Sequence, residues 1–311
     1  MFAWLPYTSL DEVRARLGPL PDGVEADVAC RAVGLPAATA DRVEYFAIGN
    51  FEAEMWGKVL ALDPPRLRWL QLASAGWEYI IDQVPPQIGL INAAGVHDTG
   101  TAETAIALAL ANLNGLDRYT RHRERQRFAP EDGDSLADKR CLIVGYGRIG
   151  QAVERRLAGF EVASVTRVAR RARTGPEVRP VADLPDLLPA ADVVFVTAPA
   201  NPESAGLLGA AALARLPDRA LVVNVGRGSV VDTDALVAEV GRGRLRAALD
   251  VTEPEPLPPG HPLWSLPGVT WSPHVGGHSG AFPRRYDRLL AHQLRRLGAG
   301  QEPDNIVRYP A

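Results

Sequence analysis

A glycine-rich turn between an apolar strand and an amphipathic helix constrains the fold of this 311-residue chain more than any other feature. The apolar run 141–144 is followed by Gly145-Tyr146-Gly147-Arg148-Ile149-Gly150, which matches the pattern G-x-G-x-x-G and opens a predicted helix at 149–157. Glycine lets the backbone approach a pyrophosphate closely, and the free N–H groups at a helix start favour an anion. The six residues therefore predict a dinucleotide site; a glycine-rich turn of a sugar-nucleotide or flavin protein is the alternative.

Short apolar runs alternate with helical stretches around this turn. We expect strands at 141–144, 162–165, 193–196, 221–225 and 245–249, and helices at 149–157, 184–188, 210–216 and 236–240. Apolar strands separated by helices indicate a parallel sheet that is covered on both faces. The expected fold class is therefore α/β, with a Rossmann-type doubly wound parallel sheet.

The first 92 residues predict a second, smaller α/β unit. Apolar runs at 43–48, 67–72 and 88–91 alternate with candidate helices at 10–17 and 51–62. The stretch Thr101 to Arg127 contains Gly115 but no proline, so we expect one long helix there. The segment 281–297 has helical spacing and would return the chain to the first unit.

The end of the second predicted strand indicates which dinucleotide fits. An acid about 20 residues beyond the glycine turn usually binds the ribose 2′-hydroxyl. Here that place is taken by Val165-Thr166-Arg167, with Arg170, Arg171 and Arg173 close behind. A hydroxyl and guanidinium groups suit a 2′-phosphate, which a carboxylate would repel. We therefore expect Thr166 and Arg167 to bind the cofactor, with NADP(H) favoured and NAD(H) possible; a solvated basic loop is the alternative.

Three candidate catalytic side chains each follow a strand-like run. Arg227 lies in Asn224-Val225-Gly226-Arg227-Gly228, Glu255 in Glu253-Pro254-Glu255-Pro256-Leu257, and His274 in Ser272-Pro273-His274-Val275-Gly276. The carboxyl ends of parallel strands face one crevice, so we expect the three residues to converge. Taken singly, each could equally be a surface arginine, a solvated acid or a turn histidine.

Together, these segments resemble the D-isomer-specific 2-hydroxyacid dehydrogenases, in the branch of glyoxylate and hydroxypyruvate reductases. The resemblance covers nearly the whole chain and rests on the glycine turn, on 224–236, on 250–264 and on Ser272-Pro273-His274. It implies hydride transfer between NAD(P)H and a small 2-oxo acid. It also implies that Arg227 and His274 bind substrate, that His274 is the acid/base and that Glu255, rather than Glu253, partners the histidine, because the acid of the family directly precedes Pro-Leu.

The chemistry of these side chains agrees with the implied roles. The planar guanidinium of Arg227 can hold a carboxylate and polarise the adjacent keto oxygen. Histidine titrates near neutral pH, so His274 can donate a proton to that oxygen as hydride reaches C2. A carboxylate bonded to the ring, here that of Glu255, would favour the charged and correctly oriented imidazole.

The resemblance extends the site to further residues. It places Ala75 and Gly76, in Ala73-Ser74-Ala75-Gly76-Trp77-Glu78, in a loop whose N–H groups receive the substrate carboxylate. Trp77 is either part of that pocket or a core aromatic, and His278 is left without a role. Further cofactor contacts are expected at Ala198, Pro199, Val225, Gly226, Asp250 and Gly277.

The resemblance also implies the domain organisation. We expect an NAD(P)-binding Rossmann domain at 96–280 and a smaller, flavodoxin-like substrate domain formed by 1–95 and 281–311. Closure of the cleft between them would exclude water during the reaction. The family pattern further implies a homodimer.

Composition and charge argue against other classes of protein. The formal net charge is −3, from 34 basic and 37 acidic residues, which favours a small-molecule partner over nucleic acid. The basic run 118–127 is therefore interpreted as a solvated face or a dimer contact. We expect no membrane association and a cytoplasmic location, because the chain start lacks a signal-peptide pattern and no apolar run approaches about 20 residues. We expect no metal site, and no disulfide between Cys30 and Cys141.

The alternative function is that of a cofactor-sensing binding protein, similar to corepressors that share this fold, because fold does not determine function. Sensing needs only the glycine turn and a mobile cleft, so the complete set of Arg227, Glu255 and His274 favours an enzyme. A formate dehydrogenase is a weaker alternative, since that branch usually has glutamine at position 255. The physiological 2-oxo acid and the direction of the reaction stay open.

Overall fold

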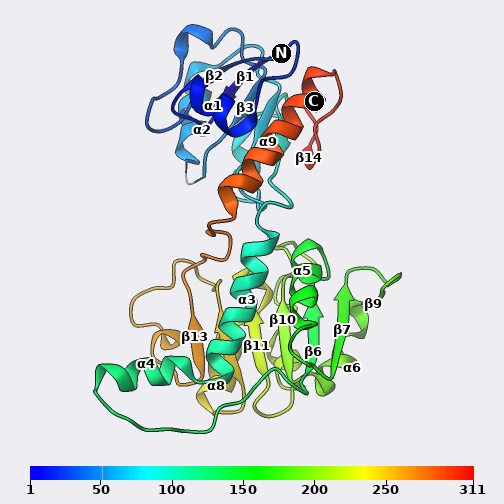
Figure 1. Cartoon of the computed structure of the whole chain (residues 1–311). Helices are drawn as coiled ribbons and strands as arrows, with labels where there is room; N and C mark the ends of the chain where they lie inside the picture. Colours follow the sequence, from blue (N-terminus) through cyan, green and yellow to red (C-terminus); the bar gives the residue numbers. More distant parts are fainter. Residues whose placement is uncertain (51) are drawn as a thin grey trace. The chain divides into compact units, whose positions relative to one another are not determined.

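The computed structural model describes residues 1–50 and 52–311. The chain divides into two compact units, a smaller one of residues 1–97 and 280–311 and a larger one of residues 98–279. Each unit is built around one sheet with helices packed against it (Figure 1). The predicted α/β class is confirmed.

The larger unit has a Rossmann-type sheet. Its strands are β6 (Arg140–Val144), β7 (Ser164–Ala169), β8 (Arg173–Thr174), β9 (Glu177–Pro180), β10 (Val193–Val196), β11 (Leu221–Asn224), β12 (Arg246–Leu249) and β13 (Val269–Trp271), in the order β13-β12-β11-β10-β6-β7-β9-β8. Neighbouring strands are parallel, except that β8 is antiparallel to β9. The strand order reverses between β6 and β10, the switch point at which doubly wound sheets bind ligands.

Side-chain alternation along the strands of the larger unit fills two separate cores. Cys141 and Ile143 of β6 pack with α3 (Asp98–Leu113) and α5 (Arg148–Leu157), which lie in front of the strands in Figure 1. Leu142 and Val144 face the opposite way, toward α6 (Leu184–Leu187), α7 (Ala210–Leu213) and α8 (Thr233–Gly241). A strand that is buried on both faces explains the continuous apolar run at 141–144.

Two expectations for the larger unit are wrong. The stretch from Thr101 to Arg127 is two helices, α3 and α4 (Leu116–Glu124), because Gly115 adopts a left-handed φ of 71° that interrupts the helix. The second strand, expected at 162–165, is β7 and continues to Ala169. It is longer because its backbone pairs with β6 from Ser164 to Val168, although its side chains are not uniformly apolar. Helix α4, which contains most of the basic run 118–127, has no buried residue, so both a solvated face and a dimer contact stay open for this run.

The smaller unit has the flavodoxin-like strand order 2-1-3-4-5. The parallel strands are β1 (Phe2–Leu5), β2 (Glu25–Val28), β3 (Tyr45–Ala47), β4 (Trp69–Gln71) and β5 (Gly89–Ile91), and β14 (Ile306–Arg308) is antiparallel to β5. Helix α2 (Glu54–Leu62) packs on one face, while α1 (Leu10–Leu17) and α9 (Phe282–Gly298) pack on the other. The helix predicted at 51–62 begins at Glu54 in the structure. Phe51 lies outside the described residues.

Short 3-10 helices complete the secondary structure of the described residues. They span Ala37–Thr39, Ile81–Gln83, Val181–Asp183, Leu188–Ala190, Gly228–Val230 and Pro262–Trp264.

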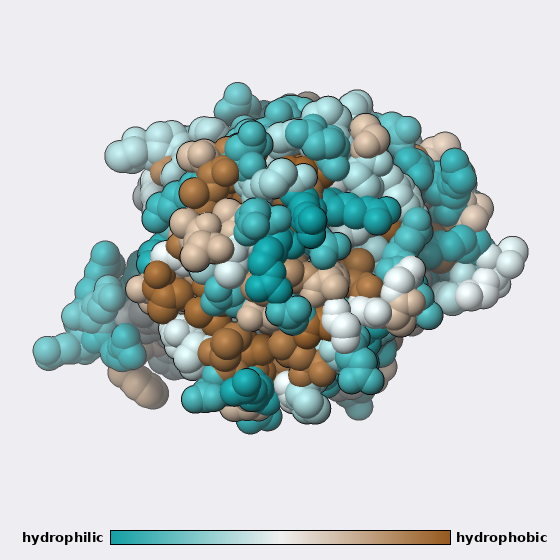
Figure 2. Space-filling model, turned by 90° about the horizontal axis from the view of Figure 1, so that it is seen from above, coloured by the Kyte–Doolittle hydropathy of each residue, from teal (hydrophilic) through white to brown (hydrophobic). Residues whose placement is uncertain are grey.

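Hydrophilic residues cover most of the face seen in Figure 2, with smaller hydrophobic patches between them. Within residues 1–50 and 52–311, no helix is long and apolar enough to cross a membrane.

Cys30 and Cys141 are both free and buried, and burial raises the pKa of the Cys141 thiol to about 12. The Cys141 side chain therefore stays a neutral part of the core.

Candidate active site

The glycine turn lies at the switch point of the larger sheet, between β6 and α5. Gly145 has a φ of 101°, and Gly147 is the N-cap of α5. A Cβ atom on Gly145 or Gly226 would clash with the backbone of Ala198. The loops that follow β6, β10 and β11 therefore meet backbone to backbone, which leaves room for a ligand to approach the amide groups at the start of α5.

A hollow of about 460 Å³ opens beside this turn. Of the predicted cofactor contacts, Gly145, Tyr146, Gly147, Ala198 and Pro199 line it. Arg148, Ile149 and Gly150 form the first turn of α5, and Val225 and Gly226 follow β11 on the same edge of the sheet. The position, the glycine backbone and the helix start fit a dinucleotide.

The predicted contacts Thr166 and Arg167 do not line this hollow. Both lie within β7, because the strand continues to Ala169. The Arg167 guanidinium is paired with Glu154 of α5, with 2.9 Å between Nε and Oε2, and this hydrogen bond is the main cause that lowers the pKa of Glu154. The second strand ends at Ala169 and Arg170 follows it, so Thr166 and Arg167 do not stand at the strand end, as the sequence suggested, and their contact with the cofactor stays a prediction.

Two other arginines of the basic segment line the hollow. Arg173 lies over the Tyr146 ring, 5.5 Å from its centroid, and donates a hydrogen bond to the Tyr146 carbonyl oxygen. Arg170 is exposed and lies 3.6 Å from the Glu203 carboxylate across the hollow. The segment that follows β7 therefore presents guanidinium groups where an acid would bind a ribose hydroxyl.

His274 and Glu255 form a hydrogen-bonded pair at the ends of β13 and β12. His274 Nδ1 lies 2.5 Å from Glu255 Oε1, and both side chains are about half exposed. Because Nδ1 faces the carboxylate, Nε2 is the ring nitrogen that can exchange a proton with a substrate.

Asp250 fixes the turn that carries His274. Its buried carboxylate, 2% exposed, accepts hydrogen bonds from Ser272 Oγ at 2.6 Å and from the N–H groups of Val275 and Gly276 at 2.9 Å. Its carbonyl oxygen also accepts from the His274 N–H at 2.7 Å. His274 has a φ of 53°, a left-handed conformation that residues other than glycine seldom adopt. These four hydrogen bonds hold the histidine in that conformation.

Arg227 follows β11 and lies in a loop that touches the loop after β12. A Cβ atom on Gly228 would overlap with the carbonyl group of Thr252, so glycine is required there. Asn224, 1% exposed, holds the loop: its Nδ2 donates to the Arg227 carbonyl oxygen at 3.0 Å and its Oδ1 accepts from Gly226 N–H at 3.1 Å. Strands β11, β12 and β13 are neighbours, so Arg227, Glu255 and His274 share one edge of the sheet.

The predicted substrate loop of the smaller unit follows β4. Asn92 Nδ2 donates to the Ala75 carbonyl oxygen at 2.8 Å, and Ser74 Oγ donates to the Gly76 carbonyl oxygen at 2.6 Å. Trp77 is partly buried against the core of the smaller unit, which favours the core-aromatic interpretation. In the larger unit, Gly277 and His278 follow the His274 turn, and His278 N–H donates to the Val275 carbonyl oxygen at 2.8 Å.

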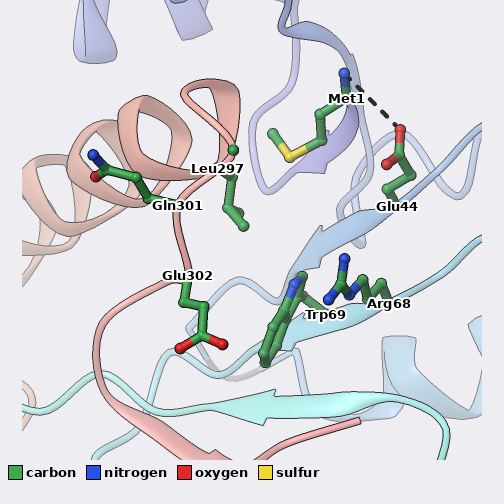
Figure 3. Close-up of a pocket in the computed structure, with 8 residues that line it drawn as sticks. Met1, Glu44, Arg68, Trp69, Leu297, Gln301 and Glu302 are labelled. Atoms are coloured by element: carbon green, nitrogen blue, oxygen red, sulfur yellow. Dashed lines mark ion pairs between the residues drawn. The ribbon is translucent and has the colours of Figure 1, made fainter.

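The smaller unit has a hollow at the edge of its sheet opposite to the loop that follows β4 (Figure 3). Met1, Glu44, Arg68 and Trp69 line it at the amino ends of β1, β3 and β4, together with Leu297, Gln301 and Glu302. The amino terminus lies 3.9 Å from the Glu44 carboxylate. Open α/β sheets bind ligands at the carboxyl ends of their strands, so this hollow is on the edge where a ligand is not expected.

Across the described residues, no group of three or more His, Cys, Asp or Glu side chains is arranged to hold a metal ion. The candidate site thus consists of a glycine turn for a dinucleotide and, on the same sheet edge, an arginine and a histidine–carboxylate pair. This arrangement defines a dinucleotide-dependent dehydrogenase.

Comparison with known proteins specifies the family. Residues 106–276 match the NAD binding domain of the D-isomer specific 2-hydroxyacid dehydrogenases. The chain is 35% identical over 318 residues to glyoxylate/hydroxypyruvate reductase B of Pectobacterium atrosepticum, covering 96% of this chain and 94% of the relative. It is 32% identical over 260 residues to a glyoxylate reductase of Aeropyrum pernix, covering 78% and 77%.

A solved structure is similar over the same length. The NADPH-dependent glyoxylate/hydroxypyruvate reductase of Sinorhizobium meliloti, in complex with citrate, superimposes with a TM-score of 0.77 at 27% identity, covering 98% of this chain and 97% of that chain. The chain belongs to the D-isomer specific 2-hydroxyacid dehydrogenase family. It is an NAD(P)-dependent oxidoreductase, which confirms the family and the enzyme class expected from the sequence. None of these three relatives is described as a sensor or corepressor.

Proposed function

We propose that this enzyme reduces glyoxylate or hydroxypyruvate with NADPH as the preferred hydride donor, using Arg227, Glu255 and His274. The observation that carries the proposal is the 2.5 Å hydrogen bond between Glu255 and His274, in a turn held by Asp250 beside the Arg227 loop. The substrate class is supported by two relatives that align with most of this chain and are named glyoxylate reductase and glyoxylate/hydroxypyruvate reductase B.

Each side chain has a distinct task in the proposed reaction. The nicotinamide, when bound, supplies a hydride to C2 of the 2-oxo acid. Arg227 binds the substrate carboxylate and polarises the keto oxygen. His274 donates the proton from Nε2 to that oxygen as the new C–H bond forms, which gives the 2-hydroxy acid. Glu255 orients the ring through Nδ1 and stabilises the imidazolium before the proton is transferred.

The two units have different proposed roles. The larger unit, with the glycine turn, binds the nicotinamide cofactor; the smaller unit presents the N–H groups of Ala75 and Gly76 to the substrate carboxylate. Asp250 and Gly277 flank the His274 turn, so contacts to the nicotinamide end of the cofactor are proposed there. The homodimer implied by the family pattern and the expected cytoplasmic location stay predictions.

The preference for NADPH is supported by charge. Arg170 and Arg173 line the hollow at the end of β7, and neither of the final residues of that strand is acidic. A 2′-phosphate would gain charge-assisted hydrogen bonds from these guanidinium groups. The similar enzyme of Sinorhizobium meliloti is described as NADPH-dependent.

Initial rates with glyoxylate, hydroxypyruvate, pyruvate and phenylpyruvate, each with NADPH and with NADH, test the proposal. We expect reduction of the first two, faster with NADPH. His274→Ala should lower kcat by about 10² to 10⁴, because general acid catalysis is lost.

His292→Ala is the matched control. His292 also bonds a carboxylate, that of Asp304 at 2.6 Å, and its side chain is 45% exposed, against 47% for His274. Its removal should leave kcat unchanged. Equal losses in the two variants, or full activity in His274→Ala, would contradict the assigned acid; faster turnover with NADH would contradict only the cofactor preference.

A further inference from the structure

The segment 92–97 of the smaller unit, which follows β5, holds the predicted substrate loop 73–76. Three consecutive carbonyl oxygens of the loop each accept a hydrogen bond from this segment: that of Ala73 from His97 Nε2 at 2.7 Å, that of Ser74 from the Ala93 N–H group at 2.8 Å, and that of Ala75 from Asn92 Nδ2 at 2.8 Å. A carbonyl oxygen can only accept, so Nε2 of the histidine carries the proton.

These three hydrogen bonds determine where the N–H groups of the loop point. A peptide bond is planar and trans, so the carbonyl group of one residue and the N–H group of the next point in opposite directions. With the carbonyl groups turned toward the segment 92–97, the N–H groups of Ser74, Ala75 and Gly76 point away from it. Within the part of the chain that the structure describes, none of these three N–H groups donates to a protein acceptor. They are therefore available to an anion.

The side chain of His97 is fixed independently of the loop. Its ring stacks on Phe282 of α9, with centroids 5.2 Å apart and an interplanar angle of 24°, and Phe282 stacks in turn on Tyr286 at 5.3 Å. Tyr286 is 4% exposed, and its hydroxyl group donates to the Ile48 carbonyl oxygen at 2.7 Å. The three stacked rings tie the imidazole to the core of the smaller unit, so Nε2 meets the Ala73 carbonyl oxygen in a fixed place.

We infer that His97 is a positioning residue for the substrate carboxylate. By holding the carbonyl oxygen of Ala73, it keeps the N–H groups of the loop 73–76 directed toward the carboxylate of the 2-oxo acid. The inference rests on the proposed function, in which this loop receives that carboxylate. His97 acts through the loop, so its effect should appear in substrate binding and not in the proton transfer assigned to His274.

Two substitutions separate the hydrogen bond of His97 from its ring stack. His97→Phe keeps an aromatic ring beside Phe282 but has no donor, so the carbonyl group of Ala73, a residue that is 7% exposed, loses its partner. The KM for glyoxylate should rise about tenfold with kcat nearly unchanged, because the carboxylate is bound alike in the ground state and the transition state. His97→Gln keeps a side-chain N–H donor of similar reach and loses the stack. It should lower the melting temperature but retain most of the affinity for glyoxylate.

The KM for NADPH should stay unchanged in both variants, since His97 belongs to the smaller unit and the glycine turn to the larger one. His292→Phe is the matched control, because His292 also lies in the smaller unit and its exposed side chain is bonded to Asp304 at 2.6 Å instead of to the loop. It should change neither KM. An unchanged KM for glyoxylate in His97→Phe would overturn the inference, as would an equal or larger rise in His97→Gln or a parallel rise in the KM for NADPH.

A calorimetric titration with oxalate, a small carboxylate without a keto group, in the presence of NADP⁺ separates this inference from the proposed function. If neither glyoxylate nor hydroxypyruvate is reduced, the proposed function fails, but the titration still shows whether the loop binds a carboxylate. Weaker binding to His97→Phe than to wild type, with binding retained in His97→Gln, supports the inference. Equal binding to wild type and His97→Phe, or no binding to any of the three proteins, contradicts it.

Discussion

Asp250 lies behind the proposed acid/base and does not hydrogen-bond to the imidazole. It acts on His274 through the backbone of the 272–276 turn, to which it contributes three carboxylate bonds and one carbonyl bond. The pattern of side chains could not show this, because two of the carboxylate's partners are backbone N–H groups that every residue type offers. The family resemblance gave Asp250 only a cofactor contact, which stays a prediction, and the hydrogen bonds of Asp250 to the turn are seen in the structure alone.

Asp250→Asn should disturb catalysis more than stability. The asparagine side chain has one acceptor oxygen, so it cannot accept the hydrogen bonds that reach both oxygens of the Asp250 carboxylate. The turn and the His274 ring should therefore shift. A displacement of about 1 Å can lower kcat by about 10²-fold. Steady-state kinetics over a range of pH, together with thermal unfolding, measures the two effects separately.

Ser272→Ala is the matched comparison, because it removes one donor and keeps both backbone bonds. It should lower kcat less than Asp250→Asn does. If Asp250→Asn reduces the melting temperature but leaves kcat and its pH profile unchanged, the residue supports the fold and does not position the acid.

At the scale of elements, the segment that leads into β6 is tied to the sheet by Asp134. Its carboxylate lies 2.8 Å from Lys139 Nζ and 2.9 Å from Arg246 Nη2 on β12. Burial acts to raise the pKa of Asp134, but the hydrogen bonds from Lys139 and Arg246 outweigh it and lower the pKa to about 2. The folded state therefore binds this proton more weakly than the unfolded chain, in which the pKa of aspartate is about 3.9.

The lowered pKa of Asp134 makes its contribution to stability dependent on pH. The contribution is complete above about pH 5 and is lost as the pH falls through about 2, since the folded-state pKa is the lower one. Asp134→Asn should reduce the free energy of unfolding by about 2 kcal/mol at pH 7, and by clearly less at pH 3. Urea unfolding at the two pH values measures this, with exposed Asp132→Asn as the control; an equal deficit at both values would contradict the assignment.

Periodic and apolar elements could be predicted from the sequence, and charged or very short ones could not. Helix α1 and strand β10 have the expected bounds, because their apolar spacing is set by burial in one core. Strand β7 extends beyond the expected end, because its backbone pairs with β6 as far as Val168 while the Arg167 side chain is paired with Glu154 on the neighbouring helix. Strands β8 and β14, of two and three residues, are determined by their partner strands and leave too little periodic signal in the sequence.

For the candidate site, the sequence indicated which residues follow the strands but not how the loops touch. Arg227, Glu255 and His274 were proposed because each follows a strand-like run, and in the structure β11, β12 and β13 are neighbours. The close contact of Gly228 with Thr252 and the edge-to-face contact of the Trp264 and Trp271 rings depend on loops that meet only in the folded unit. The aromatic residues in the segment 257–271 were visible, but no spacing indicated that they form one surface.

At the scale of the whole molecule, cofactor binding adds to folding stability, because the glycine turn, the loop after β10 and the end of β7 converge only in the folded larger unit. A ligand that binds only the folded state stabilises it by about 2.7 kcal/mol at a concentration of 100 times Kd. NADPH should therefore raise the melting temperature more than NADH does at equal concentration. Thermal unfolding with each cofactor, in the absence of substrate, measures the difference.

Arg170→Ala locates the origin of that difference. Arg170 is exposed and pairs only loosely with Glu203, so its loss should leave the melting temperature of the free protein unchanged while reducing the extra stabilisation by NADPH. Arg179→Ala is the matched control, since Arg179 on β9 is also exposed, pairs with Asp183 at 2.6 Å and does not line the cofactor hollow. Either of two results would show that Arg170 does not bind the 2′-phosphate: NADPH still raises the melting temperature more than NADH does in Arg170→Ala, or this difference is lost equally in Arg179→Ala. If it is lost in Arg170→Ala alone, Arg170, directly after β7, sets the cofactor preference of the enzyme.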